Sequence, residues 1–307
     1  MPITLIENFR AVFYAPFYAA FARGAYAAEG VEVNLTASPD PAETPNALLA
    51  GEGDVTWGGP MRVMRAYDRD PDCGLVIFCE VVARDPFFLV GREPRPEFRL
   101  EDLLDMKIGA VSEVPTPWLC LQHDLRLAGI DPARIDRVSD RSMAENAEAL
   151  RSGALDAIQV FQPFVEDLVE TGGGHIWRAA ANRGLTTYTV LYTTRGFMER
   201  DPESLERMTR AMHRTLRWIA AHGGEEFAEC VAPYFPDLPQ KTLAKALARY
   251  KALGVWNENP VMAPESFEWL QAACLSGGLI REGVSYGRCV EMRFARQAAE
   301  ENPPPGR

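Results

Sequence analysis

The sequence predicts an α/β protein built from two similar lobes. Three observations support this fold: the length, a motif that occurs twice, and an alternation of short apolar segments with helical ones. At roughly 150 residues per domain, the 307 residues correspond to two domains. The motif A-L-x-x-G-x-x-D begins at Ala47 and again at Ala149, and such self-similarity indicates a repeated structural unit.

Each copy of the motif predicts a helix end followed by a strand. Gly51 and Gly153 suit the position just after a helix, where the backbone adopts positive φ. The helix before each copy is expected to end in the same way, at Gly30 and Gly129. Four landmarks therefore recur in the same order in both halves of the repeat.

The first two hundred residues alternate strands with helices. Apolar runs predict strands at residues 3–7, 31–37, 54–58, 74–82, 86–91, 107–111, 135–139, 156–161 and 186–194. Strands separated by helices form mainly parallel sheets with right-handed crossovers. The expected helix N-termini are marked by Pro60 and Pro163 and by caps at Thr44, Thr116 and Ser142, the last in a capping box with Glu145.

The pattern after residue 200 is almost purely helical. A helix is predicted to begin at Asp201-Pro202-Glu203, and helical periodicity continues through residues 210–221, 240–253 and 264–273. The proline-rich tail at residues 302–307 is expected to be disordered.

Charge and hydropathy exclude two classes of partner. The net charge is −11, from 32 Lys and Arg against 43 Asp and Glu, so a polyanion such as nucleic acid would be repelled. No segment approaches the ~18 uninterrupted apolar residues of a membrane helix, because Glu80 interrupts the run from Cys73 to Val82. We therefore expect neither nucleic-acid binding nor membrane insertion.

The N-terminal segment allows two interpretations. Residues 11–21 are apolar, and Ala25-Tyr26-Ala27 has the form of a signal cleavage site. Glu7 upstream and Pro16 within the run instead favour the first strand and helix of a domain. We expect a cytoplasmic protein as written, the alternative being a periplasmic one whose signal was trimmed or lies elsewhere. Six cysteines without a CxxC motif fit free thiols in a reducing compartment.

Enzyme and metal signatures are missing from the sequence. It contains no GxSxG, GxxxxGK or HExxH, and its four histidines fall in separate predicted elements. We therefore expect no catalytic residue, no metal and no cofactor. Cys120 is interpreted as a buried thiol, and Glu80 and Arg84 as residues that brace the lobes.

A resemblance to a known family rests on motifs that occur in a set order. They are Asn8-Phe9 through Phe17-Tyr18-Ala19-Ala20, Gly30-Val31-Glu32-Val33, the two G-x-x-D units, the LLDMKIG segment at 103–109, and Phe197-x-x-x-x-Pro202. In these features the chain resembles the solute-binding proteins of nitrate, sulfonate, taurine and thiamine-pyrimidine uptake. That family also includes the thiamine pyrimidine synthases of yeast type.

The resemblance implies a periplasmic-binding-protein-like fold, a type II Venus flytrap with parallel-rich sheets and a helical C-terminal part. The first lobe would comprise residues 1–92 and 193–307, and the inserted second lobe residues 93–192, with the two crossings as hinge. The implied function is the substrate-binding component of an ABC-type uptake system, with a permease as partner. The alternative is a cytoplasmic enzyme on the same scaffold, a pyrimidine synthase, decarboxylase or desulfinase. Residues 8–30 lack the His, Lys and Cys that the synthases carry there, which argues against synthase activity.

The expected ligand site lies beyond the carboxyl ends of the strands, where open α/β sheets bind ligands. This rule selects four loops, at residues 8–14, 57–60, 112–118 and 161–164, with Arg62 one turn after the second. The candidate ligand-binding residues are Asn8, Phe9, Arg10, Phe13, Tyr14, Trp57, Gly58, Gly59, Pro60, Ser112, Thr116, Trp118, Phe161, Gln162 and Tyr188.

The composition of these loops indicates the class of ligand. Many rings around a few amides and hydroxyls favour an aromatic or heteroaromatic solute over a bare inorganic anion such as nitrate. We expect the solute to bind the first lobe, after which the second lobe rotates about the hinge and buries it.

Overall fold

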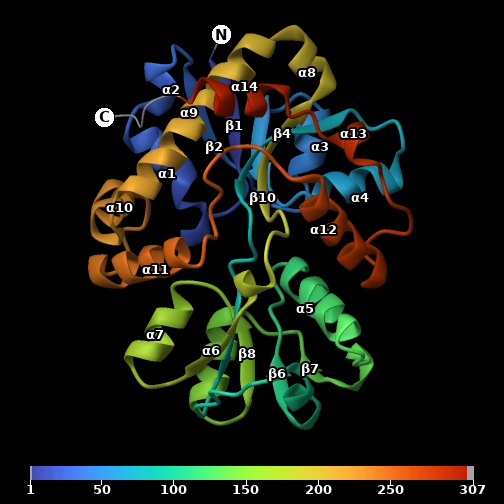
Figure 1. Ribbon diagram of the computed structural model, residues 1–307, viewed down its shortest axis with the longest axis vertical. Helices are drawn as coiled ribbons and strands as arrows, with labels where there is room; N and C mark the ends of the chain where they lie inside the picture. The colour runs from blue at the N-terminus through green and yellow to red at the C-terminus, as the bar shows by residue number, and fades with distance from the viewer. Residues whose placement is uncertain (1, 303–307) are drawn as a thin grey trace.

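The computed structural model describes residues 2–302 and forms two lobes, each built on a five-stranded sheet (Figure 1). The strand order in the first lobe is β2 (Val33–Ala37), β1 (Ile3–Glu7), β3 (Val55–Gly58), β10 (Thr189–Thr194) and β4 (Leu75–Val82). The strand order in the second lobe is β7 (Asp136–Val138), β6 (Lys107–Gly109), β8 (Ala157–Val160), β5 (Phe88–Gly91) and β9 (His175–Ala179). The predicted two-lobed α/β architecture is confirmed.

The two sheets share one topology. In each sheet the first two pairings are parallel and the last two are antiparallel. The antiparallel strands β10 and β5 each enter from the other lobe. A strand that enters at the edge where the parallel strands end must run away from that edge, so it is antiparallel to them. The sheets are therefore mixed, not mainly parallel as expected.

The chain crosses between the lobes twice, at residues 83–87 and 180–188, and the two crossings run side by side (Figure 1). The carbonyl of Ala83 accepts hydrogen bonds from the N–H groups of Thr186 and Thr187, at 2.9 and 3.1 Å. Because β5 belongs to the second sheet and β10 to the first, both crossings come a few residues before the divisions expected after 92 and 192. Each crossing continues directly into an apolar strand, so the sequence carries no break in pattern there.

The repeated aspartate has the same structural role in both lobes. Asp54 Oδ2 accepts a hydrogen bond from the N–H of Thr4, at 2.9 Å, and so ties β3 to the start of β1. Asp156 Oδ2 accepts one from the N–H of Lys107, also at 2.9 Å, and ties β8 to the start of β6. The motif thus marks the point where the central strand of each sheet joins its parallel neighbour, β1 or β6.

The repeated glycines end helices as predicted. All four adopt positive φ: Gly30 (72°), Gly51 (79°), Gly129 (77°) and Gly153 (76°). A side chain with a Cβ is strained in this region, whereas glycine is not. The predicted helix ends are therefore confirmed at all four positions.

Of the three predicted caps, only Ser142 is confirmed. Its hydroxyl accepts from the N–H of Glu145, whose carboxylate accepts from the N–H of Ser142, as in a capping box. The other two helices begin at Thr44 and Thr116 themselves, without a side-chain cap. The caps predicted there were wrong because a proline occupies N2 and the hydroxyl of Thr44 turns instead to Pro41 and Ser38.

The helices cover both sheets and extend the first lobe. The helices that follow strands within the lobes are α1 (Ala15–Ala22), α2 (Ala25–Ala28), α3 (Thr44–Leu49), α4 (Met61–Arg69), α5 (Thr116–Leu127), α6 (Met143–Arg151) and α7 (Phe164–Glu170). Those of the C-terminal part are α8 (Arg195–Arg200), α9 (Pro202–Ala221), α10 (Gly224–Val231), α11 (Gln240–Ala252), α12 (Pro264–Ser276), α13 (Tyr286–Cys289) and α14 (Arg293–Glu301). The helical C-terminal part predicted from the sequence is confirmed.

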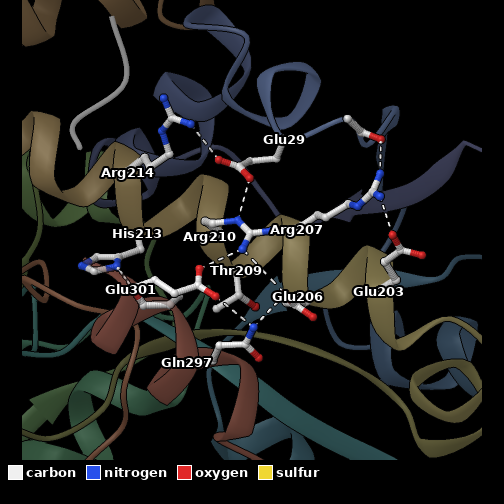
Figure 2. A network of polar contacts seen from close by, with 12 residues as sticks. Glu29, Glu203, Glu206, Arg207, Thr209, Arg210, His213, Arg214, Gln297 and Glu301 are labelled. Atoms are coloured by element: carbon white, nitrogen blue, oxygen red, sulfur yellow. Dashed lines mark hydrogen bonds and ion pairs between the residues drawn. The ribbon is translucent and has the colours of Figure 1, made fainter. Parts of the chain in front are cut away.

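A network of ion pairs joins the C-terminal helices to the first lobe (Figure 2). The carboxylate of Glu29, next to α2, accepts from Arg210 at 2.7 Å and from Arg214 at 2.8 Å, both on α9. Arg210 also pairs with Glu301 of α14, at 2.8 Å. Helix α9 therefore links the beginning of the chain to its end.

Two further sequence-based expectations concern membrane insertion and the C-terminal tail. Across residues 2–302, none of the helices has the length and hydrophobicity of a membrane span. The tail expected to be disordered falls, from residue 303 onward, outside the described part of the chain.

Candidate functional site

The candidate site is the space between the lobes, beside the two crossings. The first lobe contributes the loop after β1 (residues 8–14) and the loop after β3 (residues 59–62), and the second lobe contributes residues 114–116. Phe87 and Tyr188, one from each crossing, complete the wall. Because β1, β3 and β6 are parallel within their sheets, their carboxyl ends present these loops at one edge.

Aromatic rings form most of the wall. The ring of Phe13 lies 4.3 Å from that of Tyr14, 6.0 Å from that of Tyr188 and 5.3 Å from that of Phe161, measured between centroids. Phe9 adds a further ring, 5.1 Å from Tyr14. Such a wall offers faces and edges on which a planar ligand can stack.

The hydroxyl groups in this wall are buried and protonated. Burial raises the pKa of Tyr14 to about 12, with the neighbouring Asn8 side chain and the charge of Arg62 opposing the rise. Burial likewise raises the pKa of Tyr188 well above its ordinary value. The Tyr188 hydroxyl has no hydrogen-bond partner among residues 2–302, and a buried hydroxyl without a partner costs free energy. It can therefore donate to a ligand.

Positive charge reaches the same space from two sides. The guanidinium of Arg62, half-buried at the start of α4, belongs to the wall and donates to the carbonyl of Pro41. Opposite it, α5 begins at Thr116 without a side-chain cap, so its first N–H groups present a partial positive charge. Within the described residues, no carboxylate, cysteine or histidine lines this space.

The space between the walls is narrow. Its volume is about 20 Å³, whereas sites for small organic ligands occupy about 300–1,000 Å³. Entry of an organic solute therefore requires the lobes to move apart or the wall rings to rotate.

The hinge beside the site contains a buried ion-pair cluster. Arg183 on the second crossing donates to Asp85 on the first and to Asp124 of α5, at 2.6 Å in each case. The side chain of Asp85 is fully buried, and those of Arg183 and Asp124 are 6% exposed. The guanidinium also lies over Trp269 of α12, 5.0 Å from the ring centroid. The cluster thus joins both crossings to one helix of each lobe.

The structure brings seven of the predicted ligand-binding residues together in this wall. They are Asn8, Phe9, Phe13, Tyr14, Gly59, Thr116 and Tyr188. The ring of Phe161 contacts that of Phe13 but does not line the space. Gly58 and Pro60 flank Gly59 and do not line it either. Their role in ligand binding stays a prediction.

Two predicted residues of the first lobe are engaged elsewhere. Arg10 turns away to pair with Glu7, at 3.0 Å. Trp57 is fully buried in the first lobe and stacks on Phe17, with centroids 4.6 Å apart and planes at 5°. The stacking of Trp57 was missed because its contact with Phe17 depends on how α1 packs on the sheet, whereas the pairing of Arg10 with Glu7 is local and could have been considered.

The remaining three belong to the second lobe. Trp118 packs under the guanidinium of Arg137, 4.4 Å away. Ser112 is exposed, beside Glu113. The amide of Gln162 is buried. Its nitrogen donates to the carboxylate of Glu166 at 2.9 Å, and its oxygen accepts from the N–H of Glu166 at 3.1 Å. Both ends of the amide therefore have partners at the start of α7.

Sequence reasoning missed Met61, Phe87, Val114 and Pro115 as wall residues and noticed Arg62 without selecting it. Phe87 ends the first crossing, where the pattern indicated only a strand. Met61 and Arg62 could have been selected only because they closely follow Gly58 and Gly59 in the sequence.

Comparisons with known proteins identify a family and relatives of the same fold. A family model described as NMT1/THI5 like matches residues 12–226. The protein YtlA of Bacillus subtilis (strain 168), whose name describes it as a binding protein, is 22% identical over 97% of this chain and 90% of its own.

Two solved structures share the fold. SsuA of Methylobacillus flagellatus KT, a periplasmic sulfonate-binding protein assigned to an ABC transporter, has a TM-score of 0.77 at 14% identity, covering 98% of this chain and 94% of its own. A mutant of the desulfurization enzyme DszB, in complex with biphenyl-2-sulfinic acid, has a TM-score of 0.72 at 15% identity, covering 98% and 100%.

Proposed function

The chain belongs to the NMT1/THI5-like family, and from this premise we propose that it is the solute-binding component of an ABC-type import system. Its solute is a small aromatic or heteroaromatic molecule that carries an electron-rich polar group. Its partner is the permease of that system. The observation that carries the ligand class is the ring wall of Phe13, Tyr14 and Tyr188 with an unpartnered, protonated Tyr188 hydroxyl.

The polar features of the wall support the second part of the ligand class. Arg62, the N-terminus of α5 and the Tyr188 hydroxyl all favour an acceptor or a negative charge. The two similar structures are a sulfonate-binding protein and an enzyme in complex with an aromatic sulfinic acid. A ligand with an aromatic ring and an oxyanion or carbonyl substituent can stack on the rings of the wall and accept hydrogen bonds from its donors.

Closure of the lobes on the solute follows from the hinge. The crossings at 83–87 and 180–188 are short and run side by side, so rotation about them changes the width of the space without breaking either sheet. The rotation presents the permease with a solute-bound shape that differs from the open one.

The alternative, an enzyme on the same scaffold, finds less support in the wall. A general base, nucleophile or metal cluster would have to lie within reach of the solute. The wall contains Asn, Thr, Tyr and Arg, and residues 2–302 hold no group of three His, Cys, Asp or Glu side chains placed for a metal ion.

A thermal-shift panel of pyrimidines, aromatic acids, sulfonates and nitrate tests the proposal. A true ligand at 100 times its Kd stabilises by about 2.7 kcal/mol, and a shift of about 2–4 °C per kcal/mol follows for a chain of this size. The ligand recovered unchanged after long incubation supports binding. Conversion to a product would establish the enzyme alternative, and a response to nitrate alone would overturn the aromatic assignment.

A further inference from the structure

A second, wider groove adjoins the candidate site on the first lobe. It lies between α3 and α4 and has a volume of about 340 Å³, which falls within the range of small-molecule sites. Met61 and Arg62 line both this groove and the space between the lobes. The two spaces therefore share one wall.

Three arginines of α4 line the groove: Arg62, Arg65 and Arg69. At spacings of three and four residues they lie on one face of the helix. Arg65 and Arg69 are exposed, and neither forms a hydrogen bond, ion pair or ring contact with any of residues 2–302. Their guanidinium groups are therefore available to a ligand.

Arg65 and Arg69 contrast with several paired arginines elsewhere on the first lobe. On the same lobe Arg10 pairs with Glu7, and Arg210 and Arg214 both pair with Glu29. Two acids do line the groove, but their carboxylates are bonded to their own neighbours. Glu43 accepts from the side chain of Asn46, and Asp70 accepts from the N–H of Asp72, at 3.0 Å.

Apolar side chains line the rest of the groove. Pro45 and Leu49 of α3 lie across from the arginines, Ala66 lies on α4 beside them, and Leu49 is 46% exposed. A groove with arginines along one side and an apolar floor suits a small organic oxyanion, because the guanidinium fork holds a carboxylate, sulfonate or phosphate while the floor covers the hydrocarbon body.

We propose that this groove is a second binding site, for a small organic oxyanion, at the entrance to the space between the lobes. The arginines concentrate oxyanions from solution against the repulsion of the net charge of −11, and Arg62 passes them to the inner wall. The entrance role rests on the proposed function, whereas binding of oxyanions to the groove does not.

The test is an NMR titration of the ¹⁵N-labelled protein with benzoate, and with benzamide as a neutral molecule of the same shape, at constant ionic strength. We expect benzoate to shift the backbone amides of residues 42–49 and 61–73, and benzamide to leave them in place. The double variant Arg65→Gln/Arg69→Gln should weaken this response by about tenfold in Kd. The matched control Arg99→Gln/Arg134→Gln, which removes the same charge from the second lobe, should leave it unchanged.

Three outcomes would overturn the groove site: an equal response to benzamide, an equal loss in the control variant, or groove amides that stay in place throughout. Amides of residues 8–14 and 188 report the space between the lobes in the same spectra. A response there without one in the groove overturns only this inference, and a groove response with silent inner amides counts against benzoate-like ligands for the proposed function.

Discussion

The ring of Phe13 in the first lobe stands edge-on to the ring of Phe161 in the second, with centroids 5.3 Å apart and planes at 79°. Phe161 also meets Phe87 of the first crossing, at 5.1 Å. The contact therefore joins the two lobes at the point where the wall of the candidate site meets the hinge. Edge-to-face pairs contribute about 0.5–1.5 kcal/mol beyond the burial of area, which is enough to shift the balance between open and closed lobes.

Replacing Phe161→Leu should favour the open arrangement, because an apolar residue remains but both ring contacts are lost. We expect a larger radius of gyration by small-angle X-ray scattering and a stability loss of about 1 kcal/mol. Phe98→Leu is the matched control, since Phe98 stacks on Trp177 within the second lobe, at 5.3 Å. An unchanged radius in the first variant would show that this ring pair does not hold the lobes.

Replacing Tyr188→Phe should have opposite effects on stability and on binding. The buried hydroxyl has no partner, so its removal should leave the free energy of unfolding unchanged or raise it by up to about 1 kcal/mol. A ligand that accepts its hydrogen bond should bind about tenfold more weakly.

Tyr26→Phe is the control for this prediction. Tyr26 on α2 also has a buried, unpartnered hydroxyl, but it lies outside the wall. Urea unfolding and calorimetric titration with a solute identified in the panel measure the two effects. Equal affinity in both variants would remove the Tyr188 hydroxyl from the site.

Replacing Arg183→Met should be strongly destabilising. The change leaves the carboxylates of Asp85 and Asp124 buried and close together, at a cost of about 3–5 kcal/mol near neutral pH. Burial already raises the pKa of Asp85, with Arg183 opposing the rise. Loss of Arg183 should raise it further, so acidification should protonate Asp85 and shrink the difference in stability from the wild type.

Urea unfolding near pH 7 and near pH 4.5 checks this sign. Arg178→Met provides the comparison, because Arg178 also bonds Asp124, at 3.1 Å, but is 30% exposed. Two results would contradict this explanation of the cluster. One is an equally large loss of stability in Arg178→Met, and the other is a loss in Arg183→Met that grows on acidification.

Replacing Glu80→Gln should make the protein more stable at high pH. Burial raises the pKa of Glu80 to about 8, with the hydrogen bond that the Asn257 amide donates to its carboxylate, at 2.6 Å, opposing the rise. The folded protein therefore holds a proton that the unfolded chain releases above about pH 4.5. Wild-type stability should fall between these two pH values, by up to about 1.4 kcal/mol per pH unit.

The glutamine variant lacks this proton, so its advantage over the wild type should be absent below about pH 4.5 and grow up to about pH 8. Melting temperatures across that range measure the difference. Glu268→Gln, at an exposed position on α12, should show no such trend. A pH-independent difference between Glu80→Gln and the wild type would mean that Glu80 is ionised in the folded state.

The helix ends and most strands could be predicted because their causes are local. Glycine at positive φ ends a helix whatever surrounds it, and Gly51 and Gly153 do so. The strand β9 was not predicted, because His175–Ala179 is a short edge strand with a single neighbour and only partial burial. Its pattern alone does not separate it from a loop.

The sequence by itself determined that the protein has two lobes of repeated α/β units, since the A-L-x-x-G-x-x-D motif recurs with its glycines and strands in order. Only the tertiary structure decided the direction of β5 and β10, the stacking of Trp57 on Phe17, and the meeting of Phe13 with Phe161. Local preferences act through neighbouring residues and leave a readable pattern. The contacts that shape the site join segments up to about 175 residues apart, such as those of Phe13 and Tyr188, and their positions depend on how whole elements pack.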